Sequence, residues 1–405
     1  MWTHSWPSRG TAMAAPTYPE RHRVRRHLQP GDQIVAALAP FLGFADHLVH
    51  RIVCRAWRRS CRILGRAPPP FPWLMLPPPL PPAGGPGPAP GTAQRRVFYD
   101  IPGGRSYAYP IPASYRHVTS RSGWLVLIAS DSPRRLLVLN PITGGQVVVS
   151  WPFKEDTDGF LAVLTAPLGD PGCFLAVATD RLIKYCHPAG GGEWATLRAL
   201  GFRYDAALSD LVSVGDTVYL VDERRKIWRA DLAAAQPKVE RKDTAFALPQ
   251  GEWWRHYLVE SLGHILLVVS DPHHKRLGLY RLRWDVNLWV SMPASGLGDS
   301  VLLLGRGCSA AVPASAAAGR LPGTVLVAHQ PFRCSFLHVG IGWLNFPGGG
   351  GDQPWFWTES RLGAGLGDDQ LVVRKSVPHW PLWSGGFTIG DSFWFFPGID
   401  ESDCP

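Results

Sequence analysis

From residue 96 onward, the chain alternates short apolar runs with turn residues such as Gly, Pro, Asn and Asp. Three pairs of runs have the length and spacing of β-hairpins. They are 136–139 with 146–149, 218–221 with 227–230, and 264–270 with 277–284. No helical pattern of comparable length occurs in this part of the chain, which argues against parallel βαβ units. The pattern predicts a mainly antiparallel β domain over residues 96–405.

The predicted hairpins recur with a loose common plan. A Gly or Gly-Asp turn opens several of them, at 215–216, 263, 298–299 and 390–391. A tryptophan closes several units, at Trp151, Trp194, Trp289 and Trp343. Spacings of roughly 35–50 residues between units match the four-stranded blades of a β-propeller. We therefore expect a β-propeller-like (kelch-like) domain. A pair of β-sandwiches is the alternative, although the segment is long for a single sandwich.

Residues 28–66 have a helical pattern instead. Apolar residues with helical spacing predict two short helices, one begun by Asp32 and ended by Gly43, the other begun by Asp46. Their apolar positions are Ile34, Val35, Leu38 and Leu42, then Leu48, Val49, Ile52, Val53, Ala56 and Trp57. So small a unit has too little core to be stable alone, and its exposed apolar side chains favour a partner surface. The expected fold class is mainly β with this small N-terminal α unit.

Two further segments flank the helical unit. Residues 1–27 are a Pro-, Arg- and His-rich tail without periodicity, predicted to be disordered. Residues 67–95 are rich in Pro and Gly and are predicted to be an extended linker, since proline fits neither a helix interior nor a central strand. A ligand for a proline-binding module is the alternative. Within this segment, the apolar run 73–76 is expected to dock on the large domain as an edge strand.

Composition narrows the class of protein. With 45% hydrophobic and 18% charged residues in 405, the chain as a whole is not intrinsically disordered. No run is long enough for a transmembrane helix and no secretory signal pattern occurs, so we expect no membrane partner. The seven cysteines fit free thiols in a reducing compartment better than a disulfide framework.

The formal net charge of +9 is concentrated before residue 67, and the remainder is nearly balanced. This distribution argues against a basic groove on the large domain, and no nucleic-acid partner is expected. The cluster Arg21–Arg26 is a solvated tail or an import signal, and an Arg-rich, acid-poor leader is also typical of transit peptides. The expected location is the nucleus and/or the cytoplasm, with organelle import left open.

Motifs for catalysis or metal binding are lacking. There is no Cys-x-x-Cys, His-x-x-x-His, Gly-x-Ser-x-Gly or paired-carboxylate segment, and the glycine-rich stretch 363–367 has no Walker lysine. We predict no catalytic residue, metal or cofactor. Most of the 18 tryptophans are expected in the core, with Trp380 and Trp383 as candidates for an exposed substrate-binding surface because Pro378 and Pro381 place them on a loop.

The helical unit resembles the F-box motif. The resemblance is carried by Leu28–Ile34 (Leu-Gln-Pro-Gly-Asp-Gln-Ile), Leu38-Ala-Pro40, Asp46-His-Leu48 and, most specifically, Val53–Arg58 (Val-Cys-Arg-Ala-Trp-Arg). F-boxes bind a Skp-type adaptor, and the resemblance assigns that role to a set of matching positions. These are Pro30, Ile34, Leu38, Val53 and Trp57.

The rest of the chain resembles plant F-box proteins with a C-terminal KIB-type domain of unknown function. The matching segments are Trp73-Leu-Met-Leu-Pro77, Arg121–Leu127, Leu139–Gly144 and Leu297–Cys308. The resemblance implies a non-catalytic substrate receptor of a ubiquitin ligase, with a Skp-type adaptor, a cullin scaffold and an unknown target protein as partners. The alternative is a nuclear or organellar interaction protein with a vestigial F-box and an Arg-rich targeting leader. An enzyme that uses the propeller channel would need clustered acids or a metal trio, which the sequence lacks.

Overall fold

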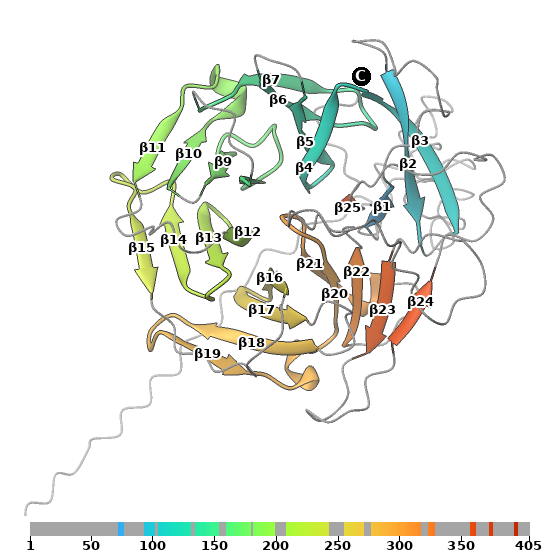
Figure 1. The fold of residues 1–405 in the computed structure, drawn as a ribbon, viewed down its shortest axis with the longest axis vertical. Coiled ribbons are helices and arrows are strands. Elements are labelled where there is room, and N and C mark those ends of the chain that lie inside the picture. The colour runs from blue at the N-terminus through green and yellow to red at the C-terminus, as the bar shows by residue number, and fades with distance from the viewer. Residues whose placement is uncertain are drawn as a thin grey trace, which may run out of the picture. The chain divides into compact units, whose positions relative to one another are not determined.

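The computed structural model arranges its strands in six sheets around a common centre (Figure 1). It describes residues 72–76, 93–101, 104–130, 134–153, 159–179, 181–198, 208–242, 255–270, 277–316 and 323–328, with the backbone of 357–361, 372–375 and 393–395. All of them belong to the unit Pro68–Pro405. The sheets are the blades of a β-propeller, as the repeat spacing predicted, and the β-sandwich alternative is wrong.

The first three blades each contain four strands, ordered from the axis outward. Blade 1 comprises β25 (Phe393–Phe395), β1 (Trp73–Met75), β2 (Ala93–Asp100) and β3 (Arg105–Pro112). Blade 2 comprises β4 (Tyr115–Arg121), β5 (Trp124–Ala129), β6 (Arg135–Leu139) and β7 (Gln146–Ser150). Blade 3 comprises β8 (Leu161–Leu164), β9 (Leu175–Ala178), β10 (Leu182–Cys186) and β11 (Ala195–Arg198).

The remaining three blades follow in the same order from the axis. Blade 4 comprises β12 (Leu208–Val214), β13 (Thr217–Asp222), β14 (Ile227–Asp231) and β15 (Val239–Lys242). Blade 5 comprises β16 (Arg255–Ser261), β17 (His264–Ser270), β18 (Leu277–Arg283) and β19 (Leu288–Ser291). Blade 6 comprises β21 (Ala310–Pro313), β20 (Ser300–Leu304), β22 (Thr324–Ala328), β23 (Trp357–Arg361) and β24 (Val372–Lys375). The described helices are the short 3-10 turns η2 (Pro188–Gly190), η3 (Ala294–Leu297) and η4 (Ala314–Ala316).

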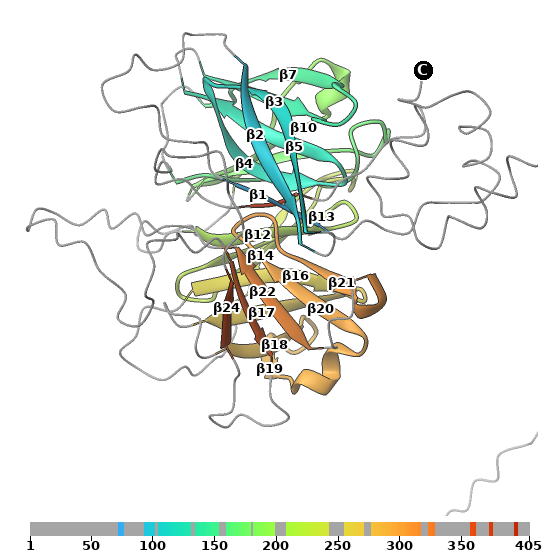
Figure 2. The ribbon, with the colours of Figure 1, turned by 90° about the vertical axis from the view of Figure 1, so that its right-hand side faces the viewer.

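Hydrophobic burial explains the position of the strands within a blade. Strands near the axis are covered on both faces, so β5, β8, β9, β20 and β22 are apolar runs that are buried throughout. The outermost strands are only partly covered. In β7 and β19, one side chain is buried and its neighbours along the strand are exposed. The side view shows the inner strands β12 and β16 of neighbouring blades side by side (Figure 2).

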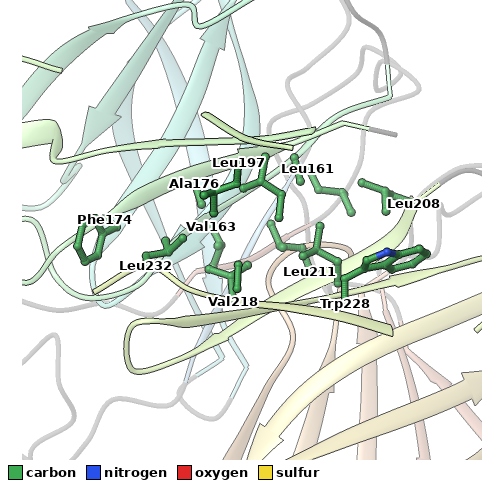
Figure 3. Close-up of a cluster of buried hydrophobic side chains, with 14 residues drawn as sticks. Leu161, Val163, Phe174, Ala176, Leu197, Leu208, Leu211, Val218, Trp228 and Leu232 are labelled. Carbon is green, nitrogen blue, oxygen red and sulfur yellow. The ribbon is translucent and has the colours of Figure 1, made fainter. Parts of the chain in front are cut away.

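The core lies between blades rather than in one central cluster. One cluster fills the space between blades 3 and 4, where Leu161, Val163 and Phe174 face Leu211, Val218 and Trp228 (Figure 3). Equivalent clusters lie between blades 2 and 3, 4 and 5, and 5 and 6. Each blade is therefore stabilised mainly by its neighbours, which favours a closed ring over separate sheets.

The ring is closed by strands from both ends of the described chain. β1 pairs antiparallel with β25 on one side and with β2 on the other. The prediction that 73–76 docks on the large domain is therefore confirmed, but the predicted edge position is wrong, because β1 is an interior strand of blade 1. The predicted linker 67–95 likewise includes strand residues, since Ala93 already begins β2. Trp73, Leu74 and Met75 are each almost fully buried. The free energy gained by burying these apolar side chains outweighs the tendency of the neighbouring prolines to disfavour an interior strand.

Blade 6 departs from a simple antiparallel meander. β21 forms a hairpin with β20 on the axial side, and β20 then pairs in parallel with β22. The described strands of the other blades pair antiparallel. The turn between β20 and β21 therefore lies on the inner side of blade 6, next to the propeller axis.

All three predicted hairpins are present, as β6–β7, β13–β14 and β17–β18. The predicted glycine turns at 215–216 and 263 join β12 to β13 and β16 to β17, and both glycines have positive φ. Trp151 and Trp194 adjoin the outer strands β7 and β11, while Trp289 lies in β19. The predicted tail 1–27, the helical unit 28–66, the turn 390–391 and Trp343 lie outside the described residues. Among the residues that are described, no helix has the length and hydropathy of a membrane-spanning segment.

Candidate functional site

The turn Gly305–Ser309, called the axial turn from this point, reaches the inner strands of three other blades. The Gly307 N–H donates to Asp210 Oδ1 of β12 at 2.7 Å, and the Thr119 hydroxyl of β4 donates to the Gly307 carbonyl. A methyl group on Gly307 would lie 3.9 Å from the Ala162 carbonyl oxygen of β8. Because β4, β8 and β12 converge at the centre, the axial turn occupies the propeller axis at this level (Figure 1).

Local geometry holds the axial turn in shape. The Cys308 N–H donates to the Gly305 carbonyl at 3.0 Å, and the Ser309 hydroxyl donates to the same carbonyl at 2.9 Å. Gly307 has φ +70°, a conformation that glycine adopts without strain. The Arg306 side chain extends from the turn to blade 4, where its guanidinium donates to the Leu208 carbonyl at 3.4 Å.

Two β-bulges precede the residues that hold Gly307. The register with the neighbouring strand shifts between His117 and Thr119 in β4, and between Leu208 and Asp210 in β12. A bulge inserts one residue and redirects the side chains that follow it. Thr119 and Asp210 thereby point to the same glycine from two different blades.

Asp210 has no solvent exposure, and each of its oxygens accepts a main-chain hydrogen bond. Leu258 N–H of β16 donates to Oδ2 at 2.7 Å, opposite the bond from Gly307 to Oδ1. Burial raises the pKa of Asp210 to about 7, although these hydrogen bonds and Arg306 act in the other direction. The carboxyl therefore joins blades 4, 5 and 6 at the axis.

A second link joins the same inner strands near their other ends. The Arg121 guanidinium of β4 donates to Ser213 Oγ at 2.7 Å and to the Ser213 carbonyl at 3.2 Å. Ser213 of β12 in turn donates its hydroxyl to the Leu164 carbonyl of β8 at 3.2 Å. Blades 2, 3 and 4 are therefore joined by polar contacts as well as by apolar packing.

Within the described ranges, no group of three His, Cys, Asp or Glu side chains is placed to hold a metal ion. Burial raises the pKa of the Cys173 thiol to about 11 and that of Cys186 to about 12, so both remain protonated at neutral pH. The described contacts at the axis join neighbouring blades.

The sequence-predicted adaptor-binding residues Pro30, Ile34, Leu38, Val53 and Trp57 lie outside the described residues, as do Trp380 and Trp383. Among the described tryptophans, Trp73, Trp124, Trp228 and Trp289 are buried, in line with the expectation that most tryptophans are core residues. Sequence analysis did not single out Asp210, Thr119, Arg121 or Ser213. One signal was available for Asp210, an acidic residue inside the apolar strand 208–214.

Comparison with known proteins identifies the propeller. A family model described as the KIB1-4 beta-propeller matches residues 98–336. No curated protein matches the chain. The solved structures found by fold comparison share little sequence with it, so they indicate at most a common fold.

Three of these structures illustrate the similarity. Kluyveromyces lactis Hsv2 is 10% identical, with 49% of this chain and 81% of that chain covered and a TM-score of 0.27. Citrobacter koseri AztD is 11% identical, with 49% and 51% covered and a TM-score of 0.29. BBS1N, solved in complex with ARL6DN, is 15% identical, with 48% and 60% covered and a TM-score of 0.30. The match spans less than two thirds of the last two chains, and similarity at this level carries no argument about activity.

The family assignment therefore depends on the matched domain itself. Its boundaries take in blades 2 to 5 completely, together with the axial turn and Asp210. The match extends over more than half of the chain. This chain belongs to the KIB1-4 beta-propeller family.

Proposed function

We propose that the chain is the substrate-receptor subunit of a Skp-cullin-F-box ubiquitin ligase. The F-box-like segment 28–66 would bind the Skp-type adaptor, and through it the cullin scaffold, while the propeller binds a target protein. The observation that carries the proposal is the order of parts, an F-box-like motif followed by a KIB1-4 propeller. A β-propeller domain supports a protein-interaction role, and here the axial turn occupies the axis of the ring.

In this role the chain catalyses nothing itself. A receptor holds a lysine of the target close to the conjugating enzyme, which raises the effective concentration of the two reacting groups. A rigid ring suits this task, because a flexible receptor would lose part of that gain in conformational entropy. The polar links through Asp210 and Arg121 supply rigidity at the centre of the ring.

Adaptor binding is tested by pull-down of a purified Skp-type adaptor with the full chain. The double variant Pro30→Ala/Trp57→Ala removes a residue expected to begin the first helix and an apolar anchor of the second. We expect the wild-type chain to retain the adaptor and the double variant to lose it. The matched control is Val148→Ser, an exposed apolar residue on β7 that should bind as the wild type does.

The pull-down is read together with the circular dichroism of each variant, so that loss of binding is compared between folded propellers. Failure of the wild-type chain to retain the adaptor would contradict the receptor proposal. In that case the Arg-rich segment before residue 28 favours a nuclear or organellar interaction protein with a vestigial F-box. Microscopy of a fluorescent fusion with and without residues 1–27 separates the two hypotheses. Removing these residues changes the location of the fusion protein only if they are a targeting leader.

A further inference from the structure

β19 is an edge strand with exposed apolar side chains. It is the outermost strand of blade 5, and β18 is the strand it pairs with in the described sheet (Figure 1). Its four residues, Leu288-Trp-Val-Ser291, include neither a charged residue nor proline. Leu288, Val290 and the preceding turn residue Val286 are three of the five exposed large apolar side chains in the described part of the chain. An apolar edge of this kind attracts a further strand unless something protects it.

The main-chain groups that β19 directs outward follow from its register. The Met292 N–H, one residue past the strand, donates to the Leu279 carbonyl of β18 at 2.9 Å. Bonded and non-bonded pairs alternate along an antiparallel ladder, so Ser291 and Trp289 direct their N–H and C=O groups away from β18. Among the described residues, no main-chain group bonds to these outward groups. The edge therefore offers two donors and two acceptors to an added strand.

β7 shows how the same kind of edge is covered elsewhere in the ring. It is also an outermost strand without charge or proline, and Val148 at its centre is exposed. Here, however, the Trp194 indole of blade 3 donates to the Ser150 carbonyl at 3.0 Å, and η2 packs against the strand.

The other outer strands are protected by their own sequences, which contain charged residues or proline. These residues are Arg105, Pro110 and Pro112 in β3, Arg198 in β11, Glu240, Arg241 and Lys242 in β15, and Arg374 and Lys375 in β24. Charge and proline on an edge oppose pairing with a further strand. Of the outer strands that the structure describes, β19 is thus the one with neither a protective sequence nor a cover.

Positive charge lies beside this edge on both sides of blade 5. Arg281 of β18 is directly opposite Val290, and opposite residues in a sheet share a face. On the side towards blade 4, the Lys242 ammonium lies 5.4 Å from the ring centre of Trp284, which packs against the cluster between these blades. The described structure gives neither Arg281 nor Lys242 an ion pair. An added strand therefore meets positive charge whichever way its acidic side chains point.

We propose that β19 is a docking edge for an extended segment of the target protein, which adds to blade 5 as a fifth strand. The segment would have alternating apolar and acidic residues, with the apolar ones beside Leu288 and Val290. A second copy of this chain is a poorer occupant, because each copy has a formal net charge of +9 and would bring its own Arg281 to the shared edge. The identity of the occupant as a target protein rests on the receptor proposal.

The probe is a fluorescein-labelled peptide in which Val and Glu alternate over about eight residues, the length of an ordinary strand. Fluorescence anisotropy follows its binding to the full chain at constant ionic strength. We expect saturable binding of the Val-Glu peptide. A Ser-Glu peptide of the same charge should bind about tenfold more weakly or less, because it has no apolar side chains to lie beside Leu288 and Val290.

Ser291→Pro tests the edge itself. It removes an outward N–H but no hydrogen bond to β18, and proline is tolerated where its nitrogen faces away from the sheet. We expect it to weaken binding of the Val-Glu peptide about tenfold, while Ser291→Ala binds as the wild type does and both variants keep the circular dichroism of the wild type. Equal binding by Ser291→Pro would overturn the proposal, because charge elsewhere on the chain would then hold the peptide.

A charge reversal supplies a gain that misfolding cannot produce. Arg281→Glu/Lys242→Glu should reverse the preference, so that a Val-Lys peptide binds more tightly than the Val-Glu peptide. An unchanged preference would contradict the proposed acidic partner.

Light scattering after size-exclusion chromatography tests the other occupant. A wild-type dimer that Ser291→Pro converts to a monomer would overturn the proposal in favour of a second copy of the chain. The peptide assay contains no adaptor, so loss of peptide binding and loss of adaptor binding are separate results. The first contradicts the docking edge, and the second contradicts the receptor proposal.

Discussion

Asp210 joins parts of the chain that are far apart in sequence. It lies in β12 and accepts hydrogen bonds from Leu258 in β16 and Gly307 in the axial turn. In Asp210→Asn, the amide nitrogen replaces one acceptor, so one of the two main-chain donors is left unsatisfied. We expect this variant to lower the free energy of unfolding by about 1–3 kcal/mol, measured by chemical denaturation at about pH 4, where the contribution of Asp210 is still nearly full. An unchanged midpoint would contradict the role of Asp210 as a fastening group.

The raised pKa of Asp210 predicts a pH dependence of stability. The folded state keeps a proton up to about pH 7, whereas the unfolded chain releases it near the ordinary value of 3.8. The contribution of Asp210 to the free energy of unfolding is therefore full below pH 3.8 and is lost as the pH rises through 7. Denaturation curves between about pH 5 and 8 should show a larger loss for the wild type than for Asp210→Asn. Parallel losses would exclude Asp210 as the cause.

Leu262 offers a stabilising substitution. It occupies the turn between β16 and β17 with φ +52° beside Gly263 at +76°, a pair typical of the two-residue type I′ turn. Its side chain is 75% exposed, so it gains little from burial in return for the strained backbone. Leu262→Asn should raise the free energy of unfolding by about 1 kcal/mol, since asparagine tolerates this conformation. Thermal denaturation measures the gain, and Leu262→Val, which adds a β-branched side chain, should show a loss instead.

At the scale of elements, β1 is the strand that closes the ring. It has only three residues, yet it pairs with both β2 and β25, and Leu74 at its centre has no exposed surface. Leu74→Ala should lower the free energy of unfolding by about 2–5 kcal/mol through the lost burial and the cavity that remains. Val148→Ala on the outer strand β7 is the matched control, and it should stay within about 0.5 kcal/mol of the wild type. Equal effects would contradict the closing role of β1.

The strands and their pairing could largely be predicted from the sequence, because a hairpin such as β6–β7 needs only two apolar runs and a turn such as 140–145. The interior position of β1 could not, since its partner β25 lies more than 300 residues away and proline surrounds it. The same limit applies to the axial turn. Thr119 and Gly307 are 188 residues apart, and local patterns carry no information on such pairs.

At the scale of the whole molecule, the described contacts assign separate tasks to separate parts of the propeller. The axis is fastened by Asp210, Thr119 and the axial turn. The apolar clusters between blades hold the ring together. Under the receptor proposal, the loops and outer strands are the parts of the propeller that remain for recognition of a target protein.

The measurement that tests the receptor account most directly is the stoichiometry of the full chain with a Skp-type adaptor. Size-exclusion chromatography with light scattering reports the mass of the complex, and the chain alone contributes 44.5 kDa. We predict a one-to-one complex for the wild type, and separate peaks for Pro30→Ala/Trp57→Ala with an unchanged propeller. A wild-type chain that elutes apart from the adaptor, or a double variant that still forms the complex, would contradict the assignment of residues 28–66 as an adaptor-binding F-box.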